Sequence, residues 1–457
     1  MVKFGTDGWR ARIAEEFNFD NVRKVAKAHA RVLKDKGLNK VLIGYDWRFR
    51  SEDFAKAVYD VMKTEGLEVN LAGSACTTPM VSFGVKYLGY DGGVMITASH
   101  NPPVYNGYKI KEHFGGSATP EFVKEVESKI NGENVEAKEY EPTFREIRKH
   151  YVEKLRELIN LDLLREREAL IVHDSMHGTT SGILEYILRD TKISVVNIRK
   201  HRDPLFGGNP PEPIEKYMGI TKEKVKSIGA NLGIANDGDG DRIALVDEKG
   251  NYVNTQLIYA MLLLHILENK GKKGKVVKTV STTYLADRIC REFGVPLIEV
   301  GVGFKNINEI ILKEGGVIFG GEESGGYGIP DYLPERDGIF SALNILELIY
   351  LKDKSLSEVI DEIFKRFGTA YYRRIDLKVE EKVKKKIEEL KENPPERIGS
   401  MKVREVKKID GVKFVFEDDS WLLMRPSGTE PLIRVYAEAP SEDEVGKLLE
   451  AGIELIK

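Results

Sequence analysis

The chain has 457 residues, of which 41% are hydrophobic and 31% are charged. This composition is typical of a globular protein, and the length predicts two to four domains because a single hydrophobic core stops growing well below it. The 70 basic and 73 acidic side chains leave a net charge of −3, which excludes the broad basic surface that nucleic-acid binding requires.

The cysteines and the apolar runs predict a cytoplasmic protein without a membrane partner. Cys76 and Cys290 are too few for a metal cluster or a disulfide framework, which favours a reducing compartment. The N-terminal segment carries no apolar leader. The longest apolar run, residues 257–267, is too short to span a bilayer, and we expect a buried helix there.

One order of elements recurs three times along the first 367 residues. Each copy has a strand, an amphipathic helix, a second strand and a third strand that ends in a glycine-rich or polar loop. The expected strands begin, in chain order, at residues 40, 67 and 92, at 169, 192 and 231, and at 275, 295 and 315. Such alternation predicts largely parallel sheets with helices on both faces. Ligands of such sheets bind beyond the carboxyl ends of the strands, so the three loops are candidates for one cleft.

Four domains are expected from the punctuation between the copies. A charged helical stretch, residues 141–169, separates the first two copies, and a hairpin signal at 246–251 precedes the third. After residue 368 the pattern changes to a strand, a charged helix, three strands between 406 and 439, and a helix at 441–456. The predicted fold is three similar mixed α/β units plus a C-terminal α+β domain around a central cleft. The predicted bounds are 1–150, 151–252, 253–367 and 368–457.

The first of the polar loops, TASHNPPVYNGYK at residues 97–109, offers a nucleophile; we call it the serine loop. Ser99 and His100 are adjacent, and Lys109 lies ten residues beyond the serine. A serine hydrolase is disfavoured because the chain has no G-x-S-x-G elbow and no Asp–His pair in the hydrolase order. A serine can instead carry a phosphoryl group, provided that a cation, an acid or base and a water-excluding site accompany it. Lys109 and Arg10, in the turn FGTDGWRA, are candidates for the acid or base.

The second loop, DGDGDR at residues 237–242, predicts a metal site; we call it the aspartate loop. Asp237, Asp239 and Asp241 alternate with glycines, and in an extended backbone their side chains would share one side. Oxygen ligands of this kind suit Mg²⁺ or Ca²⁺. An EF-hand is disfavoured because Arg242 stands where its turn needs glycine and a strand-like run follows. A site with three oxygen ligands that leaves room for a phosphate oxygen fits Mg²⁺ best.

Two further loops complete the set. The glutamate loop, GGEESGG at 320–326, offers carboxylates that can accept hydrogen bonds from neighbouring sugar hydroxyls, although glutamates in such turns are also commonly only solvated. The arginine loop, RPSGTEP at 425–431, supplies Arg425, two hydroxyls and a glycine that lets backbone N–H groups approach an anion. Taken alone, the arginine loop is equally compatible with a plain turn.

Together the four loops, in this order and with FGTDGWR and NGYK, resemble the α-D-phosphohexomutase family, most closely its phosphoglucomutase/phosphomannomutase branch. The resemblance spans Phe4 to Arg434. It implies a four-domain molecule, a phosphoserine at Ser99 and a Mg²⁺ held by Asp237, Asp239 and Asp241 together with Ser99. Gly326 stands where several family members have a histidine, so the resemblance supplies no acid or base from that position.

The resemblance also assigns roles to the remaining candidates. Residues placed around the reacting phosphoryl group are Ser99, Lys109, His100, Arg10 and Arg242. Glu322 and Ser324 would contact sugar hydroxyls. Residues that would hold the phosphate that is not transferred are Arg425, Ser427, Gly428 and Thr429.

The implied activity is reversible phosphoryl transfer between the 1- and 6-positions of glucose or mannose phosphates. A bisphosphorylated sugar would form, turn around and return its other phosphate to the serine, with glucose 1,6-bisphosphate or its mannose equivalent as activator. The partners would be small sugar phosphates, and the protein a monomer or homodimer. The alternatives are a phosphoglucosamine mutase, a non-catalytic sugar-phosphate sensor and, if water reaches the phosphoserine, a phosphatase.

Overall fold

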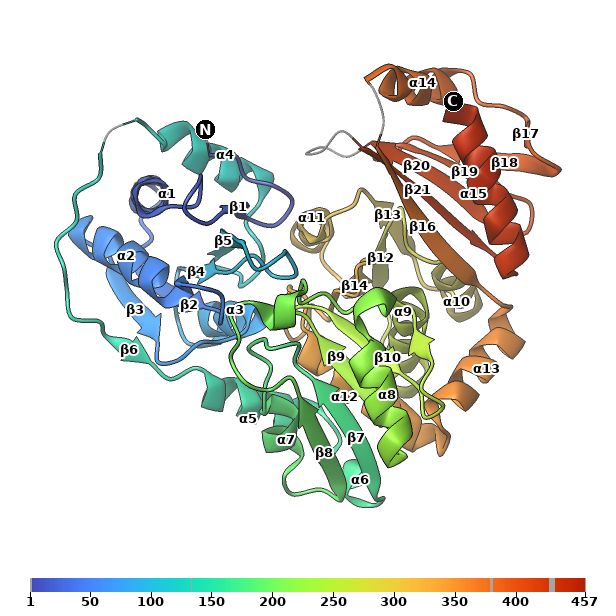
Figure 1. Ribbon diagram of the computed structural model, residues 1–457, viewed down its shortest axis with the longest axis horizontal. Coiled ribbons are helices and arrows are strands. Elements are labelled where there is room, and N and C mark those ends of the chain that lie inside the picture. The colour runs from blue at the N-terminus through green and yellow to red at the C-terminus, as the bar shows by residue number, and fades with distance from the viewer. Residues whose placement is uncertain (1, 133, 379–380, 427–431, 457) are drawn as a thin grey trace.

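The computed structural model describes residues 2–132, 134–378, 381–426 and 432–456. It contains four sheets, each covered by helices, and the chain passes from one sheet to the next in sequence order (Figure 1). Three sheets are mixed α/β units and the fourth is antiparallel, which confirms the predicted fold class. Among the described helices, none has the length and apolar character needed to cross a membrane.

The first sheet has the strand order β1-β5-β4-β2-β3-β6. Its strands are β1 (Trp9–Arg12), β2 (Lys40–Tyr45), β3 (Glu68–Ala72), β4 (Gly92–Ile96), β5 (Tyr105–Glu112) and β6 (Phe144–Arg145). Its helices are α1 (Phe19–Asp35), α2 (Ser51–Thr64), α3 (Thr78–Tyr87) and α4 (Pro120–Lys129). Strands β2, β3 and β4 run parallel, whereas β5 runs antiparallel to both β4 and β1.

Alternating side chains of β2 pack on opposite faces of this sheet, as the period of a strand requires. Val41 and Ile43 join the cluster that contains the helices α1 and α2. Leu42 lies on the other face, in the cluster that contains α3 and continues into the second and third units. The first unit is therefore packed on both sides, and α3 attaches it to the rest of the molecule.

The second sheet has the order β11-β10-β9-β7-β8, with β8, β7 and β9 parallel and β10 antiparallel to β9. Its strands are β7 (Ala169–Asp174), β8 (Ile193–Ile198), β9 (Leu232–Asn236), β10 (Ile243–Val246) and β11 (Tyr252–Val253). The helices are α5 (Arg148–Leu158), α6 (Leu161–Arg165), α7 (Ile183–Leu188) and α8 (Gly219–Ile228), with short 3₁₀ turns η1 (Phe206–Gly208) and η2 (Glu215–Tyr217). The predicted hairpin at 246–251 is confirmed, because it joins the antiparallel strands β10 and β11.

The third sheet has the order β13-β12-β14-β15. Its strands are β12 (Lys275–Thr279), β13 (Leu297–Val300), β14 (Val317–Gly321) and β15 (Tyr327–Gly328). The helices are α9 (Thr255–Leu264), α10 (Leu285–Phe293), α11 (Phe304–Glu314), α12 (Gly338–Lys352) and α13 (Leu356–Phe367), and a π-helical turn, η3 (His265–Asn269), extends α9. Every residue of α9 is buried, so the apolar run at 257–267 is the core helix that its length predicts.

The fourth sheet is antiparallel, in the order β16-β21-β20-β19-β18-β17, and lies at the opposite end of the molecule from α2 (Figure 1). Its strands are β16 (Tyr371–Lys378), β17 (Arg397–Ile398), β18 (Met401–Lys407), β19 (Val412–Phe416), β20 (Trp421–Pro426) and β21 (Leu432–Ala439). The helices α14 (Glu381–Glu392) and α15 (Glu442–Ile456) complete the domain.

Two predictions about elements are wrong in part. Residues 141–169 were expected to be helical throughout, but helix begins only at Arg148 and Phe144–Arg145 pair with β3 instead. In the fourth domain β17 and β18 were not predicted. The strand β18 carries polar residues on most of its exposed positions, so it lacks the apolar alternation by which a strand is recognised.

Candidate active site

Ser99 lies in a turn just beyond the carboxyl end of β4. Its backbone has a φ of 53°, a left-handed conformation that a non-glycine residue adopts only where its surroundings enforce it. The side chain is buried, and its hydroxyl donates to an Asp237 carboxylate oxygen at 2.7 Å. His100 is in reach as well, with Nδ1 3.3 Å from the serine oxygen. The hydroxyl is thus aimed at the aspartate loop.

The guanidinium of Arg48 fixes the backbone of the serine loop. Its Nη2 donates to the carbonyl oxygens of Ser99 and Asn101, each at 2.6 Å, and its Nη1 donates to the carbonyls of Pro102 and Tyr105 at 3.0 and 3.1 Å. The Arg48 side chain is fully buried. Four carbonyls held by one rigid fork account for the left-handed conformation at the serine.

Asp46 supports this arginine from below. Its carboxylate lies 3.3 Å from Arg48 Nε and accepts hydrogen bonds from Thr97 Oγ1 and Ser51 Oγ, both at 2.6 Å. Thr97 in turn accepts the backbone N–H of Ser99 at 2.9 Å. A connected set of buried hydrogen bonds therefore runs from the end of β2 to the candidate nucleophile.

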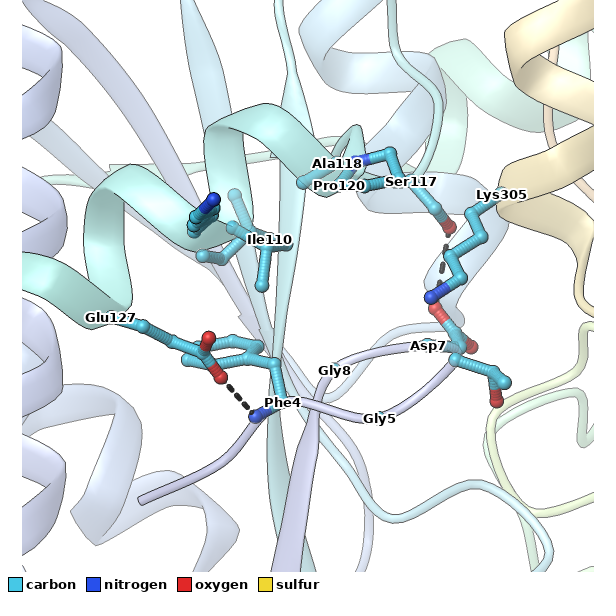
Figure 2. Close-up of a pocket in the computed structure, with 13 residues that line it drawn as sticks. Phe4, Gly5, Asp7, Gly8, Ile110, Ser117, Ala118, Pro120, Glu127 and Lys305 are labelled. Atoms are coloured by element: carbon cyan, nitrogen blue, oxygen red, sulfur yellow. Dashed lines mark hydrogen bonds between the residues drawn. The ribbon is translucent and has the colours of Figure 1, made fainter. Parts of the chain in front are cut away.

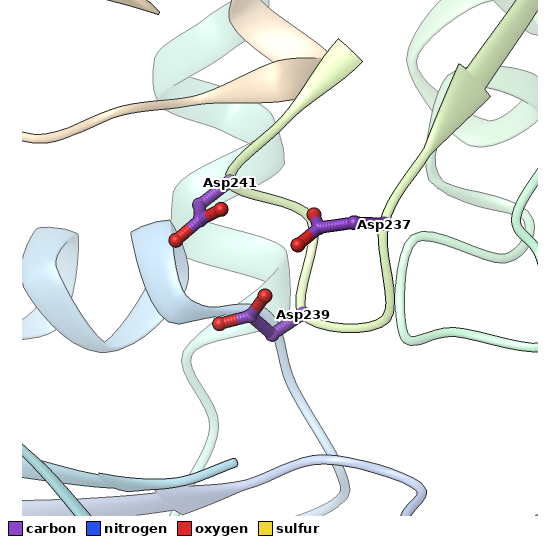
Figure 3. A group of neighbouring side chains, drawn as sticks. All are labelled: Asp237, Asp239 and Asp241. Atoms are coloured by element: carbon purple, nitrogen blue, oxygen red, sulfur yellow. The ribbon is translucent and has the colours of Figure 1, made fainter. Parts of the chain in front are cut away.

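The aspartate loop joins β9 to β10 and brings Asp237, Asp239 and Asp241 together (Figure 3). One oxygen from each of these carboxylates lies within 4.8 Å of the others, and all three side chains are buried. The backbone reason given from sequence is wrong, because the segment is a turn and not an extended strand. Gly240 has a φ of 75°, and a Cβ there would lie 2.6 Å from Thr180 Cγ2. Glycine is therefore required for the curvature that makes the carboxylates converge.

The aspartates are partly neutralised by a buried lysine. Lys109 Nζ lies 2.8 Å from Asp239, 3.0 Å from Asp241 and 2.8 Å from Asp7. Burial alone would lower the pKa of Lys109, but the three carboxylates outweigh it and hold the pKa well above its ordinary value. Thr78 Oγ1 also donates to Asp239, at 2.5 Å.

The remaining electrostatics of the triad fit a bound cation. Burial and the charges of Asp239 and Asp241 raise the pKa of Asp237 well above its ordinary value. One oxygen each of Asp239 and Asp241, both Oδ1, is buried without a hydrogen-bond partner among the described residues. Three close carboxylates with unsatisfied oxygens are the ligand set that a hard divalent cation prefers. The residues present could therefore hold such an ion.

Three more predicted residues lie around Ser99. Arg10 Nη1 donates to the side chain of Asn101 at 2.8 Å, and Arg242 donates its backbone N–H to Asp237 Oδ1 at 3.1 Å. His100 is buried, and this burial, together with the charge of Arg242 and other cations nearby, lowers its pKa well below 6.5. In the absence of an anion, His100 is therefore neutral.

The glutamate loop follows β14 and is hydrogen-bonded to the aspartate loop's strand, since Ile243 N–H donates to the carbonyl of Gly325 at 2.9 Å. Glu322 is buried and accepts the backbone N–H of Gly303 at 2.9 Å. Burial raises the pKa of Glu322 to about 7. The Ser324 hydroxyl is buried and has no hydrogen-bond partner among the described residues. Both side chains have hydrogen-bonding capacity left for a ligand.

Arg425 ends β20 on the fourth sheet and faces the third unit. Its Nε donates to Asp410 Oδ2 at 2.7 Å, and the same carboxylate oxygen accepts the backbone N–H of Val302 at 3.0 Å. Asp410 thus joins the fourth domain to the loop that precedes α11. The other predicted residues of the arginine loop, Ser427, Gly428 and Thr429, lie outside the described residues.

A cavity of about 340 Å³ lies beside this cluster, between the N-terminal segment and α4 (Figure 2). Asp7 lies at its edge and accepts a hydrogen bond from Ser117 at 3.2 Å. Lys305, from α11 of the third unit, reaches toward it from the opposite side. The lining therefore combines residues of the first and third units.

Sequence reasoning missed four residues of this cluster: Asp7, Asp46, Thr78 and Arg336. Asp7 lies in the quoted turn FGTDGWRA, where only Arg10 was selected. Its proximity to Lys109 depends on the antiparallel pairing of β1 with β5. Thr78 and Arg336 lie outside the four loops, and no motif in the sequence marks them.

Known protein families were compared with the chain over its whole length. Models described as phosphoglucomutase/phosphomannomutase alpha/beta/alpha domains I, II and III match residues 1–136, 149–250 and 254–367. The model of the C-terminal domain of the same family matches residues 375–455. The four matches together cover most of the chain.

Individual relatives carry two names. A phosphoglucomutase/phosphomannomutase of Thermococcus kodakarensis is 33% identical over 99% of this chain and 98% of its own length. A protein of Thermococcus gammatolerans named "Probable phosphoglucosamine mutase" is also 33% identical, over 99% of this chain and 98% of its own.

A solved structure agrees with the fold. The crystal structure of a protein from Thermus thermophilus, a phosphomannomutase by name only, has a TM-score of 0.90 and 36% identity, and the match covers 100% of this chain and 99% of that one. The chain therefore belongs to the α-D-phosphohexomutase family.

Proposed function

We propose that this chain interconverts the 1- and 6-phosphates of glucose, mannose or both, through a phosphoserine at Ser99 and a bisphosphorylated sugar. The observation that carries the proposal is the buried Ser99 hydroxyl, 2.7 Å from Asp237 and aimed at three converging carboxylates. Its backbone is held by Arg48. A nucleophile fixed next to a divalent-cation site is what phosphoryl transfer asks for, since that reaction depends mainly on positioning and electrostatic stabilisation.

Mg²⁺ is the cofactor that the residues fit. Asp237, Asp239 and Asp241 would hold it, with Ser99 next to them, and the free oxygens of Asp239 and Asp241 support this assignment. When bound, the ion would neutralise negative charge on the transferring phosphoryl group. Ca²⁺ is the less favoured ion, because it takes six to eight oxygen ligands and a site of three carboxylates is better matched to Mg²⁺ plus phosphate oxygens.

In the proposed reaction a sugar hydroxyl oxygen attacks phosphorus on phospho-Ser99. The bond between phosphorus and Ser99 Oγ breaks, and the hydroxyl proton must leave. Lys109 and Arg10 are the groups placed to handle charge and protons at this step. The raised pKa of Lys109 favours it as a fixed cation beside the phosphoryl group. His100 and Arg242 add donors on the same side.

Substrate would be held on two other sides. Glu322 and Ser324 would bind sugar hydroxyls, and the unpartnered Ser324 hydroxyl supports this role. Arg425 would bind the phosphate that is not transferred, together with Ser427, Gly428 and Thr429. After transfer, the bisphosphate would turn around so that its other phosphate faces Ser99. The four domains, 1–150, 151–252, 253–367 and 368–457, would then supply the serine, the metal ligands, the sugar ligands and the phosphate ligands.

Glucosamine phosphate is the second candidate substrate, because a relative of equal identity carries the phosphoglucosamine mutase name. A kinetic panel decides between them. The protein, Mg²⁺ and a trace of glucose 1,6-bisphosphate would be incubated with the 1-phosphates of glucose, mannose and glucosamine. We expect the highest kcat/KM for glucose or mannose. Conversion of glucosamine phosphate alone would move the assignment to that sugar, binding without any isomerisation would indicate a sensor, and release of inorganic phosphate would indicate a phosphatase.

A further inference from the structure

Arg336 is a buried cation that the reaction as described above does not use. It lies in the loop between β15 and α12, directly before Asp337, whose side chain caps α12 by accepting the N–H of Phe340 at 2.9 Å. Next in the chain, Gly338 donates its N–H to the carbonyl of Gly240 in the aspartate loop at 3.0 Å. Arg336 is only 3% exposed. Its backbone is thus held against the aspartate loop by the start of a helix.

The side chain of Arg336 contacts carboxylates from three units. Its Nη2 lies 2.5 Å from Asp7 of the first unit and 2.9 Å from Asp241 of the second. Its Nη1 lies 3.6 Å from Glu322 of the third. Since the two ends of a guanidinium are rigidly connected, the position of the glutamate loop is tied to that of the aspartate loop.

Gly326, in the glutamate loop, provides the room for this arginine. A Cβ at Gly326 would lie 2.3 Å from Arg336 Cδ and 2.9 Å from its Cγ. The φ of Gly326 is not positive, so its backbone conformation does not itself demand glycine. The space that the Arg336 side chain fills does.

We propose that Arg336 is a positioning residue that joins the sugar-binding glutamate loop to the metal-binding aspartate loop, and that Gly326 is required to admit it. The inference rests on the proposed function for the identity of the two ligands. It has a consequence that a purely structural role lacks. A cation 2.9 Å from Asp241 opposes Mg²⁺ binding, whereas the same cation orients Glu322 for the sugar. Removing it should therefore affect the two ligands in opposite directions.

The test compares Arg336→Gln, Arg336→Lys and Gly326→Ala with the wild type. Calorimetric titration with Mg²⁺ alone is expected to show about three- to tenfold tighter binding for Arg336→Gln, because a positive charge beside the ligands is lost. For the same variant, KM for the hexose 1-phosphate should rise and kcat should fall by about 10- to 100-fold. Arg336→Lys should keep the Mg²⁺ affinity near wild type but recover only part of kcat, since one ammonium cannot bridge Asp241 and Glu322.

Gly326→Ala keeps every charge and therefore tests the geometry if Arg336→Gln fails to fold. The added methyl should displace the arginine and lower kcat as much as Arg336→Gln does, and the double variant should be no worse than either single one. Gly446→Ala is the matched control. That glycine lies in α15, where an added Cβ would also meet an arginine, at 3.3 Å from Arg373 Nη2, and we expect wild-type kinetics.

Three results would overturn the inference: weaker Mg²⁺ binding by Arg336→Gln, wild-type kinetics for Arg336→Gln, or additive losses in the double variant. Failure of the proposed function is distinguishable. It would show as absence of turnover by the wild-type protein, while the Mg²⁺ titrations still report whether Arg336 opposes the metal.

Discussion

The hydroxyl of Ser99 and a carboxylate oxygen of Asp237 lie 2.7 Å apart although 138 residues separate them in the chain. The contact joins the loop after β4 of the first sheet to the loop after β9 of the second. It also explains why the first two units are packed rigidly through α3, since a nucleophile and its metal ligands on separate units must keep a fixed distance. From this relationship and its surroundings several consequences can be measured.

Replacing Asp237 should separate metal binding from stability. In Asp237→Asn we expect Mg²⁺ affinity to fall by at least about tenfold, because one of three anionic ligands is lost. In the presence of a chelator the same variant should be more stable than the wild type, since the burial and mutual repulsion that raise the pKa of Asp237 also destabilise the charged folded state. A rise in Tm of about 2–4 °C corresponds to roughly 1 kcal/mol.

Calorimetry with Mg²⁺ and thermal unfolding in chelator check the two halves. Asp247→Asn is a suitable control, because Asp247 lies outside the triad, in the turn between β10 and β11. Unchanged Mg²⁺ binding in Asp237→Asn would contradict the assignment of this residue as a ligand.

Loss of the Arg48 fork should slow the chemical step without weakening substrate binding. In Arg48→Lys, one ammonium cannot hold the four carbonyls that fix the serine loop, so kcat should fall by about 100-fold while KM stays within about twofold. Arg48→Met should be far less stable as well, by about 3–5 kcal/mol, because the Asp46 carboxylate would remain buried without its partner.

The matched control is Arg50→Met on the same turn, whose guanidinium is exposed and pairs with Asp53. Exposed pairs of this kind contribute little, so wild-type kinetics and stability are expected. A rise in KM with kcat unchanged in Arg48→Lys would show that the arginine acts on substrate binding and not on the nucleophile.

The stability of the first unit should fall in acid because of His29. This histidine is fully buried in α1, where Nδ1 lies 3.0 Å from the Tyr108 hydroxyl, and burial lowers its pKa to about 3. Below pH 6.5 the unfolded chain takes up a proton that the folded chain cannot, so stability present above pH 6.5 is lost as the pH falls toward 3. Between pH 6.5 and pH 5 the loss is about 2 kcal/mol.

Hydrogen exchange of α1, followed by mass spectrometry at pH values from about 7 to about 5 with correction for the intrinsic exchange rate, measures this loss. In His29→Gln the pH dependence should shrink by that amount, whatever the variant's absolute stability. His150→Gln, at an exposed position of α5, should leave the dependence unchanged. Equal pH dependence in the wild type and His29→Gln would show that His29 does not govern the acid sensitivity.

Much of the fold and the polar centre of the site could be predicted from sequence, because both follow from local pattern. Apolar strands alternating with amphipathic helices identified the three α/β units, and each of the first three loops directly follows a strand. The convergence of Asp237 with Asp241 was predicted although its backbone reason was wrong. Three carboxylates in five residues converge in a turn as well as they would in a strand.

The residues that sequence reasoning missed act through long-range contacts. Asp7 reaches Lys109 because β1 pairs with β5, and Thr78 reaches Asp239 across the boundary between the first two units. Arg336 lies in a loop of ordinary composition, and its importance comes from the three carboxylates around it. Such proximity is set by tertiary packing, which no local pattern encodes.

The central claim is that Ser99 carries the phosphoryl group, and labelled glucose 1,6-bisphosphate tests it most directly. The unphosphorylated protein would be mixed with Mg²⁺ and ³²P-labelled bisphosphate, then with unlabelled glucose 1-phosphate, and the label followed by peptide mass spectrometry and chromatography. We predict label first on the peptide containing Ser99 and then in hexose phosphate. In Ser99→Ala we predict no labelled peptide and turnover lower by about three orders of magnitude or more. Label on another residue, or near-normal turnover by Ser99→Ala, would contradict the account.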